Sequence, residues 1–330
     1  MRGSVDVKNI VVKIFNGYGH QHDLVIYGQV KRGRKKKAKV YTFSVLRNVI
    51  SMIKLYLIKP VEGARVHLQW NNQSMFTTTD IDGFFKFEWS SEESTPAGWH
   101  PVKIYYVDET GADSIPGEGK IFIPHSTQYG FISDIDDTVL ISHSGRKGKK
   151  LTTLLTTHPL KRKTFSDVVR FYRLLSFSHT EDTVPNPFFY VSSSEWNLYD
   201  YLSEFFRANN FPEGIFLLSD FKRAAEILKV GNTNHRGKGE RIRRILEVYP
   251  KQRFILFGDN TQQDPTIYAE IANENPDRIV AIYLRIISER KRQATVNIID
   301  TVVNKNIPIY FFENTVDAID HAKQTGLIDL

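Results

Sequence analysis

Three aspartates follow an apolar run in the stretch YGFISDIDDTVL, residues 129–140. Asp134 and Asp136 are two positions apart, so their side chains point to the same side of an extended chain. Carboxylates this close repel one another unless a cation or a proton compensates their charge. Paired oxygen ligands favour a hard divalent cation, and Mg²⁺ is the natural choice. Thr138 follows, and Asp137 fits a solvent-facing or capping residue without a chemical role.

Other polar residues follow apolar runs further along the chain. Ser192 ends the run FFYVS, and a hydroxyl beside the N–H groups of a following helix forms an anion site. Lys238 precedes a predicted helix and carries a mobile ammonium suited to a phosphate. Asp259 and Asp264 follow the run RFILF and supply a second pair of carboxylates.

Three of these assignments have alternatives. A shift of one residue would exchange the serine for Ser193, and Arg236 and Arg241 stand on either side of the lysine. Asp264 precedes Pro265, and Asp-Pro is a standard helix start, so this aspartate also fits a helix cap.

The elements that must position these residues alternate between strand and helix from residue 128 onward. Continuous apolar runs predict strands buried on both faces. These runs are 129–134, 188–192, 215–218, 253–257, 279–285 and 307–312. Segments with helical spacing of apolar residues fall between them, so we expect an α/β fold with a parallel sheet and helices on both faces. Ligands bind such sheets at the carboxyl ends of the strands, which is where the polar residues stand.

The preceding region reads as β structure. Short segments rich in β-branched and aromatic residues, among them ARVHLQW and FFKFEW, alternate with turn residues, which is typical of a mainly antiparallel β-sandwich-like domain. The stretch SVLRNVISMIK favours one helix. We therefore predict two domains, 1–127 and 128–330.

The amino-acid composition excludes several types of site and indicates where the protein acts. The sequence has no cysteine, which excludes disulfides, thiolate metal ligands and a cysteine nucleophile. It shows no secretory signal and no apolar run of membrane-spanning length, so we expect a cytoplasmic protein. The net charge is +7, and residues 141–163 hold seven Lys or Arg and no Asp or Glu. This basic segment fits either a solvated surface or contact with phosphates of a membrane or a nucleic acid.

The ordered set of motifs resembles a known group of enzymes. D-x-D-x-T at 134–138, a strand ending in Ser192, Lys238, and G-D-x-x-x-x-D at 258–264 resemble the haloacid dehalogenase superfamily of phosphohydrolases. The blocks FISDIDDTV, YVSSSEWNLYDYL, KGERIRRILEVYPKQRFILFGDN and DPTIYAEI more closely resemble the catalytic domain of the App1 family of phosphatidate phosphatases, over residues 129–290. The resemblance implies a Rossmann-like catalytic domain, with the basic segment 141–163 as its flap or cap.

The resemblance also implies roles for individual residues. Asp134 would be the nucleophile that forms an aspartyl-phosphate, and Asp136 the general acid and base. Thr138 would brace Asp136 through a hydrogen bond. Ser192 and Lys238 would hold the phosphoryl oxygens.

The same resemblance implies a metal site. The Mg²⁺ site would comprise Asp134, Asp136, Asp259 and Asp264. Asp136 would bind the ion through its backbone carbonyl, and Asp264 would orient waters of the site.

Together these features predict a Mg²⁺-dependent phosphomonoesterase that cleaves phosphatidate to diacylglycerol and phosphate. Two alternatives stay open: a phosphatase for a nucleic-acid end, a sugar phosphate or a phosphoprotein, and a non-catalytic module that binds lipid or protein. For the leading hypothesis, the partner is an anionic lipid, with peripheral membrane contact through residues 141–163. Nucleic acid is the second partner considered, and the sequence does not set the oligomeric state.

Overall fold

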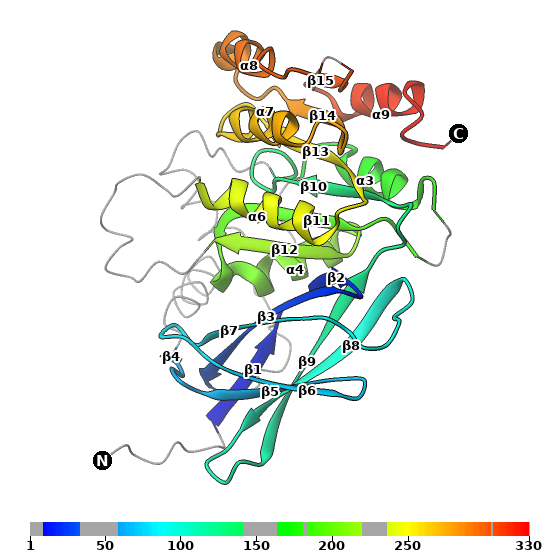
Figure 1. Ribbon diagram of the computed structural model, residues 1–330. Helices are drawn as coiled ribbons and strands as arrows, with labels where there is room; N and C mark the ends of the chain where they lie inside the picture. Colours follow the sequence, from blue (N-terminus) through cyan, green and yellow to red (C-terminus); the bar gives the residue numbers. More distant parts are fainter. Residues whose placement is uncertain are drawn as a thin grey trace. The chain divides into compact units, whose positions relative to one another are not determined.

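The computed structural model describes residues 9–33, 59–140, 164–180, 184–219, 236–304 and 306–329. These residues form two compact units that divide between His125 and Ser126, and each unit is built around its own sheet (Figure 1). The basic segment 141–163 and the helix predicted at 44–54 lie outside the described residues.

The first unit is a mostly antiparallel sheet. Its strands are β1 (Ile10–Ile14), β2 (Gly17–His20), β3 (Asp23–Arg32), β4 (Lys59–Pro60), β5 (Arg65–Trp70), β6 (Gln73–Thr78), β7 (Phe84–Trp89), β8 (Gly98–Val107) and β9 (Asp113–Ile123). They pair in the order β1-β3-β2-β9-β8-β5-β6, with β4 and β7 also on β3. Only the β2–β9 pair is parallel among these described strands. The predicted antiparallel β region is confirmed.

The sheet of the first unit encloses one apolar core. Burial alternates along β7, so its apolar residues point inward while the residues between them face water. One core cluster takes residues from β1, β3, β5, β7, β8 and β9. Gly117 and Gly119 of β9 lie against β1, where an added Cβ would come 2.8 Å from Val12 and 2.4 Å from Ile14. The two glycines therefore allow β1 to pack closely over β9 and close the core.

The second unit is a parallel sheet of six described strands. They are β10 (Tyr129–Ser133), β11 (Phe188–Glu195), β12 (Gly214–Ser219), β13 (Arg253–Asp259), β14 (Ile279–Arg285) and β15 (Ile309–Phe312). Their order in space is β12-β11-β10-β13-β14-β15, and every pair is parallel. Counted from β10, this is the order 3-2-1-4-5-6 of doubly wound α/β folds. The predicted parallel sheet is confirmed.

Helices cover both faces of this sheet (Figure 1). They are α3 (Val168–Phe177), α4 (Tyr199–Ala208), α6 (Arg236–Val248), α7 (Asp264–Glu274), α8 (Arg292–Ile299) and α9 (Thr315–Gln324), with short 3-10 turns η3 (Trp196–Leu198) and η4 (Glu289–Lys291). On β11, Phe188 contacts Tyr172 of α3, whereas its neighbour Phe189 contacts Tyr249 at the end of α6. Because successive strand residues point to opposite faces, α3 and α6 lie on opposite sides of the sheet.

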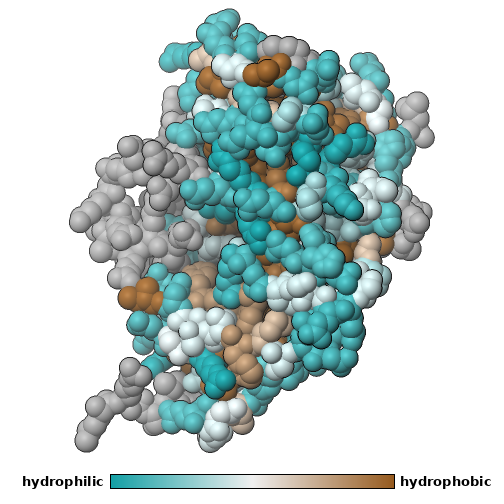
Figure 2. Space-filling model, viewed as in Figure 1, coloured by the Kyte–Doolittle hydropathy of each residue, from teal (hydrophilic) through white to brown (hydrophobic). Residues whose placement is uncertain are grey.

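Amphipathic helices account for the surface of this unit. In α3, the buried residues include Val168, Phe171, Tyr172 and Leu175, which recur at helical spacing. The face seen in Figure 2 is mostly hydrophilic over α6, α7 and α8, as expected when the apolar side of each helix packs on the sheet. Among the described residues, no helix has the length and apolar character needed to cross a membrane.

Candidate active site

The site lies where the chain reverses its direction across the sheet. β10 and β13 are neighbours in the sheet. The helix after β13, α7, contacts α6 and therefore lies on the face opposite α3, the first described helix after β10. At such a switch point the chain leaves the two strands in opposite directions, and a crevice opens at their carboxyl ends. Asp134 directly follows β10, and Asp259 is the last residue of β13. The strand order therefore brings residues 125 positions apart in the sequence to one edge of the sheet.

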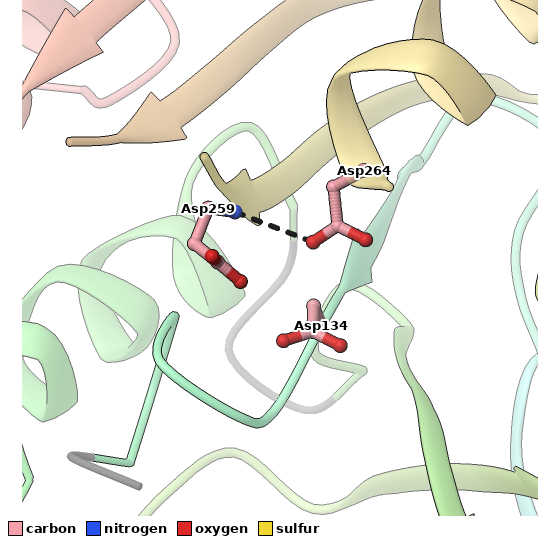
Figure 3. A group of neighbouring side chains, drawn as sticks. All are labelled: Asp134, Asp259 and Asp264. Carbon is pink, nitrogen blue, oxygen red and sulfur yellow. Dashed lines mark hydrogen bonds between the residues drawn. The ribbon is translucent and has the colours of Figure 1, made fainter. Parts of the chain in front are cut away.

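A buried cluster of charges occupies this edge. One carboxylate oxygen from each of Asp134, Asp259 and Asp264 lies within 4.8 Å of the others, and Figure 3 shows the three side chains together. Each of these residues is at most 1 % exposed. Lys238 of α6, 2 % exposed, donates from Nζ to Asp134 Oδ1 at 2.7 Å and also to Asp264 Oδ1. All four residues had been selected from the sequence, and the structure brings them together.

Burial shifts the ionisation of this cluster. The pKa of Asp134 lies well above its usual value because burial disfavours the charged form; Lys238 opposes this effect, and the neighbouring aspartates add to it. Burial, reinforced by Asp264, raises the pKa of Asp259 to about 7, although hydrogen bonds from Thr261 favour its charged form. Burial lowers the pKa of Lys238, but Asp134 and Asp264 more than compensate and raise it overall. The ammonium therefore stays charged at neutral pH.

When all three carboxylates are ionised, the cluster holds three negative charges against the one positive charge of Lys238. Asp134 Oδ2 is buried and has no hydrogen-bond partner among the described residues. An uncompensated buried carboxylate is costly, and a cation removes most of that cost. The donors are all oxygens, which suits Mg²⁺ better than a softer transition metal. The three carboxylates thus fit a hard divalent cation.

Asp136 faces a different set of groups. Its Oδ2 accepts hydrogen bonds from Ser192 Oγ at 3.4 Å and from Ser194 Oγ at 3.3 Å, so its carboxylate is not part of the three-aspartate cluster. Its backbone carbonyl accepts from Gln262 Nε2 at 3.2 Å, and the same amide donates to Asp259 Oδ2 at 3.4 Å. The Gln262 amide thus links the Asp136 carbonyl to the Asp259 carboxylate.

Ser194 and Gln262 were missed by the sequence reasoning. β11 extends to Glu195, three residues beyond the predicted end, so Ser192 and Ser194 both lie on it and reach Asp136. The alternation of side chains along a strand would have found Ser194, had the strand been extended through the polar serines. Ser193, the alternative to Ser192, instead accepts a hydrogen bond at its carbonyl from Ser219 Oγ, at 2.8 Å.

Two expectations for the turn after Asp136 are wrong. The Thr138 hydroxyl is buried and makes no hydrogen bond within the described residues, so it does not brace Asp136. Asp137, expected to face solvent or to cap, is 1 % exposed, so the first of these two alternatives is the one that is wrong. Its φ of 63° places it in the left-handed region, which Asp tolerates in turns, and its N–H donates to the Leu140 carbonyl at 2.8 Å. Asp137 thus shapes the turn that carries its neighbours.

The start of α7 fixes the position of Asp264. The N-cap is Gln263, which makes no side-chain capping bond, and Asp264 is the first residue of the helix, so the alternative of a cap is wrong. The second carboxylate oxygen of Asp264 accepts from the Asp259 N–H at 3.3 Å. Gly258 makes room for this contact, because an added Cβ would lie 2.7 Å from Asp264 Oδ2.

The basic rivals of Lys238 are placed differently. Arg241 donates from Nη2 to the Ser192 carbonyl at 3.2 Å, and so holds the end of β11 rather than the carboxylates. The side chain of Arg236 lies outside the described part of the chain. Lys238 is therefore the candidate with direct contact to the acidic cluster among the described side chains of α6.

Comparison with known proteins places the site within a matched region. Residues 129–286 match the family model described as phosphatidate phosphatase APP1, catalytic domain. The chain is 32 % identical over 161 residues to phosphatidate phosphatase APP1 of Saccharomyces cerevisiae, covering 48 % of this chain and 26 % of that protein. It is 27 % identical over 247 residues to uncharacterized protein C29B5.04c of Schizosaccharomyces pombe, covering 73 % of this chain and 38 % of the relative.

The aligned parts thus span well under half the length of the curated relatives. Among solved structures, a carbohydrate acetylesterase from Xanthomonas citri aligns over 92 % of this chain and 68 % of its own, with 7 % identity and a TM-score of 0.34. That likeness is too low to inform the fold or the function. The resemblance of residues 129–290 to the App1 catalytic domain is confirmed by the family match and by the yeast relative.

Proposed function

We propose that this protein is a Mg²⁺-dependent phosphatase of the haloacid dehalogenase type that acts on phosphatidate through an aspartyl-phosphate on Asp134. The observation that carries the proposal is the buried cluster of Asp134, Asp259 and Asp264 around Lys238, at the switch point of the sheet. The match of this region to the APP1 catalytic domain supports phosphate-ester hydrolysis.

Asp134 suits the role of nucleophile. Lys238 holds its Oδ1, while Oδ2 has no hydrogen bond within the described residues and keeps its lone pairs for attack. In the first step, an Asp134 oxygen bonds to phosphorus as the bond from phosphorus to the leaving alkoxide breaks. Asp136, protonated at the start, gives its proton to that alkoxide. The products of this step are the free alcohol and a phosphorylated Asp134.

The second step returns the enzyme to its first state. Asp136, now charged, takes a proton from a water molecule whose oxygen bonds to phosphorus as the bond to Asp134 breaks. Inorganic phosphate leaves, and Asp136 is again protonated. The hydroxyls of Ser192 and Ser194 donate to Asp136 Oδ2 and would orient it for both transfers. Ser192 and Lys238 are also the groups proposed to bind phosphoryl oxygens.

The acidic cluster is the proposed Mg²⁺ site, with Asp134, Asp259, Asp264 and the Asp136 carbonyl as its ligands. The ion would supply neutralising charge for the phosphoryl oxygens and for the buried carboxylates. Lys238 supplies part of the same compensation from its place between Asp134 and Asp264.

Phosphatidate is proposed because the yeast relative is named for that activity and because basic residues flank the nucleophile. Residues 141–163 follow the D-x-D-x-T motif directly and carry seven positive side chains without an acidic one. Such a segment would attract an anionic lipid surface, by about 1 kcal/mol for each basic residue near the membrane. We therefore propose a cytoplasmic protein with peripheral membrane contact.

The test is phosphate release by the purified protein, with Mg²⁺ or with EDTA. The substrates are phosphatidate in mixed micelles, short-chain phosphatidate, a 3′-phosphorylated oligonucleotide, a sugar phosphate and p-nitrophenyl phosphate. Asp134→Asn should lose activity by at least about 1,000-fold, as expected when a covalent nucleophile is removed. Asp277→Asn, an exposed aspartate before β14, is the matched control and should keep it.

Each outcome decides a different part of the proposal. Preference for micellar phosphatidate supports the lipid substrate, whereas release from the small esters alone or from the oligonucleotide rejects it and keeps the phosphatase. Activity that persists in Asp134→Asn or in EDTA rejects the mechanism. No release from any substrate by folded protein with Mg²⁺ rejects the enzyme in favour of a binding module.

A further inference from the structure

A buried arginine stands beside the site without a role in the chemistry above. Arg285 is the last residue of β14 and is 2 % exposed. None of the ion pairs of the described residues joins it to a carboxylate, although burying an unpaired charge is costly. All the hydrogen bonds that it makes there go to neutral oxygens. A buried charge without an ionic partner suggests that the guanidinium serves to hold neighbouring parts of the chain in position.

The guanidinium joins two parts of the chain. Nε donates to the Thr138 carbonyl at 3.3 Å, in the turn that follows Asp136. Nη1 donates to the Glu313 carbonyl at 3.1 Å and Nη2 to Thr315 Oγ1 at 3.0 Å, where β15 passes into α9. The planar fork of an arginine can hold such partners at fixed angles, which a lysine cannot.

Two aromatic rings also contact the guanidinium of Arg285. The guanidinium carbon lies 4.1 Å from the ring centroid of Phe165 and 4.6 Å from that of Phe312. Phe165 follows Thr164, which forms a β-bridge with Leu140, and its N–H donates to the Val139 carbonyl at 3.4 Å. Arg285 thus contacts the chain on both sides of the bridge that closes the turn.

The carboxylate of Asp136 depends on this turn for its position. The hydroxyls of Ser192 and Ser194 donate to its Oδ2 at 3.4 and 3.3 Å, and Gln262 Nε2 donates to its backbone carbonyl at 3.2 Å. Thr138 lies two residues further on, and its own hydroxyl makes no bond among the described residues. Backbone hydrogen bonds close the turn internally, as from the Asp137 N–H to the Leu140 carbonyl at 2.8 Å, and the bond from Arg285 to the Thr138 carbonyl ties the turn to a distant part of the chain.

We propose that Arg285 is a positioning residue that ties the turn of residues 136–140 to the β15–α9 connection and so aims Asp136 at the nucleophile. The proposal rests on the proposed phosphatase function. It assigns no contact with substrate to Arg285. A displacement of about 1 Å in a catalytic group can lower a rate by about 100-fold, so loss of this tether should reduce kcat strongly.

The test compares Arg285→Met with Arg278→Met. Arg278 precedes the same strand at its other end, donates to the carbonyls of Gln252, Leu246 and Tyr249, and lies over the ring of Phe254. Its guanidinium thus makes the same kinds of contact away from the site. Methionine keeps the length and apolar stem in both variants.

Arg285→Met should lower kcat for p-nitrophenyl phosphate by about 10- to 100-fold with KM within about 3-fold, because the turn acts on proton transfer rather than binding. Arg285→Lys should not restore kcat, because it lacks the fork. Arg278→Met should keep kcat within about 3-fold of the wild type, even where its unfolding midpoint falls by as much as that of Arg285→Met. Equal losses of kcat in Arg285→Met and Arg278→Met, or a wild-type kcat in Arg285→Met, would overturn the proposal.

Hydrogen exchange gives a readout that needs no activity. Arg285→Met should speed exchange in peptides covering 134–140 and 164–168, whereas Arg278→Met should do so near 246–254. Unchanged exchange in 134–140 rejects the inference, even where the wild type is an active phosphatase. A wild type without phosphatase activity but with this exchange pattern rejects the proposed function and keeps the tether. If Arg285→Met does not fold, Thr315→Val is used in both assays in its place, because it removes the hydroxyl that accepts a hydrogen bond from Arg285 Nη2.

Discussion

Replacing Lys238 with methionine should destabilise the metal-free second unit strongly. The ammonium is 2 % exposed, donates to Asp134 at 2.7 Å and also donates to Asp264. Removal of one partner of a buried ion pair costs about 3–5 kcal/mol, because the other charge is left uncompensated. Here two carboxylates lose their partner, but Asp134, whose pKa burial already raises, can take up a proton, so we expect a loss near the lower end, about 3 kcal/mol at pH 7.5.

The loss should shrink as the pH falls. Without the ammonium, the pKa of Asp134 in the folded state rises further, because the charge that opposed the effect of burial is lost, while its pKa in the unfolded chain stays ordinary. The folded variant then binds more protons than the unfolded chain, so its stability increases on acidification. Uptake of one proton between pH 7.5 and 5.5 recovers at most about 2.7 kcal/mol. Adding Asp264→Asn to Lys238→Met should also recover stability, with a coupling energy above about 1 kcal/mol.

Urea unfolding in EDTA, followed by circular dichroism at 222 nm, measures this loss. All helices of the described residues lie in the second unit, so the helical signal reports on the unit that contains the site. Lys291→Met is the control, because within the described residues the ammonium of this exposed lysine donates to a single carbonyl, that of Thr261, and its loss should cost less than about 0.5 kcal/mol. A loss below about 1 kcal/mol for Lys238→Met, or equal losses at pH 7.5 and 5.5, would refute the reasoning.

Two further predictions concern the same cluster. Burial raises the pKa of Asp259 from its ordinary 3.8 to about 7, so the metal-free protein should lose stability as the pH rises between these values. For the same reason, Mg²⁺ should raise Tm more at pH 7.5 than at pH 5.5. Scanning calorimetry at both pH values checks this, and equal Mg²⁺-induced shifts would contradict it. Gly258→Ala should cost about 1–3 kcal/mol and weaken Mg²⁺ binding in calorimetric titration, since its Cβ would lie 2.7 Å from Asp264 Oδ2. The control is Gly237→Ala, where the nearest atom is the flexible end of Arg241 at 3.2 Å, and a similar loss there would refute the steric argument.

The gathering of the acidic cluster was predictable because parallel strands end at one edge of a sheet. Asp134, Asp259 and Asp264 were selected as polar residues that follow apolar runs, and Lys238 as the cation ahead of a helix. Strand order decides whether such residues meet, and sequence periodicity does not give that order. The structure shows that β10 and β13 are adjacent in the sheet, which is why Asp134 and Asp259 lie close together.

Other features of the site escaped prediction for local reasons. A charged residue in a turn usually faces solvent, which was one of the two alternatives for Asp137, but this residue is buried in a turn where its N–H donates to the Leu140 carbonyl. The bond expected from Thr138 depends on a rotamer that no spacing rule fixes. Arg285 lies far from the motif along the chain, and the end of an apolar strand gives no sign that a guanidinium there reaches Thr138.

The acidic cluster should also couple metal binding to the stability of the second unit. Three carboxylates that are at most 1 % exposed, against one ammonium, stabilise the fold less than apolar side chains of similar size would. A cation that binds only the folded state adds RT ln(1 + [L]/Kd), which is about 1.4 kcal/mol at ten times Kd. Such a gain would appear in the helical transition and would vanish when Asp259 and Asp264 are replaced by asparagine. Stability therefore reports on the proposed Mg²⁺ site without reference to the substrate, and separates the assignment of the metal from the assignment of the lipid.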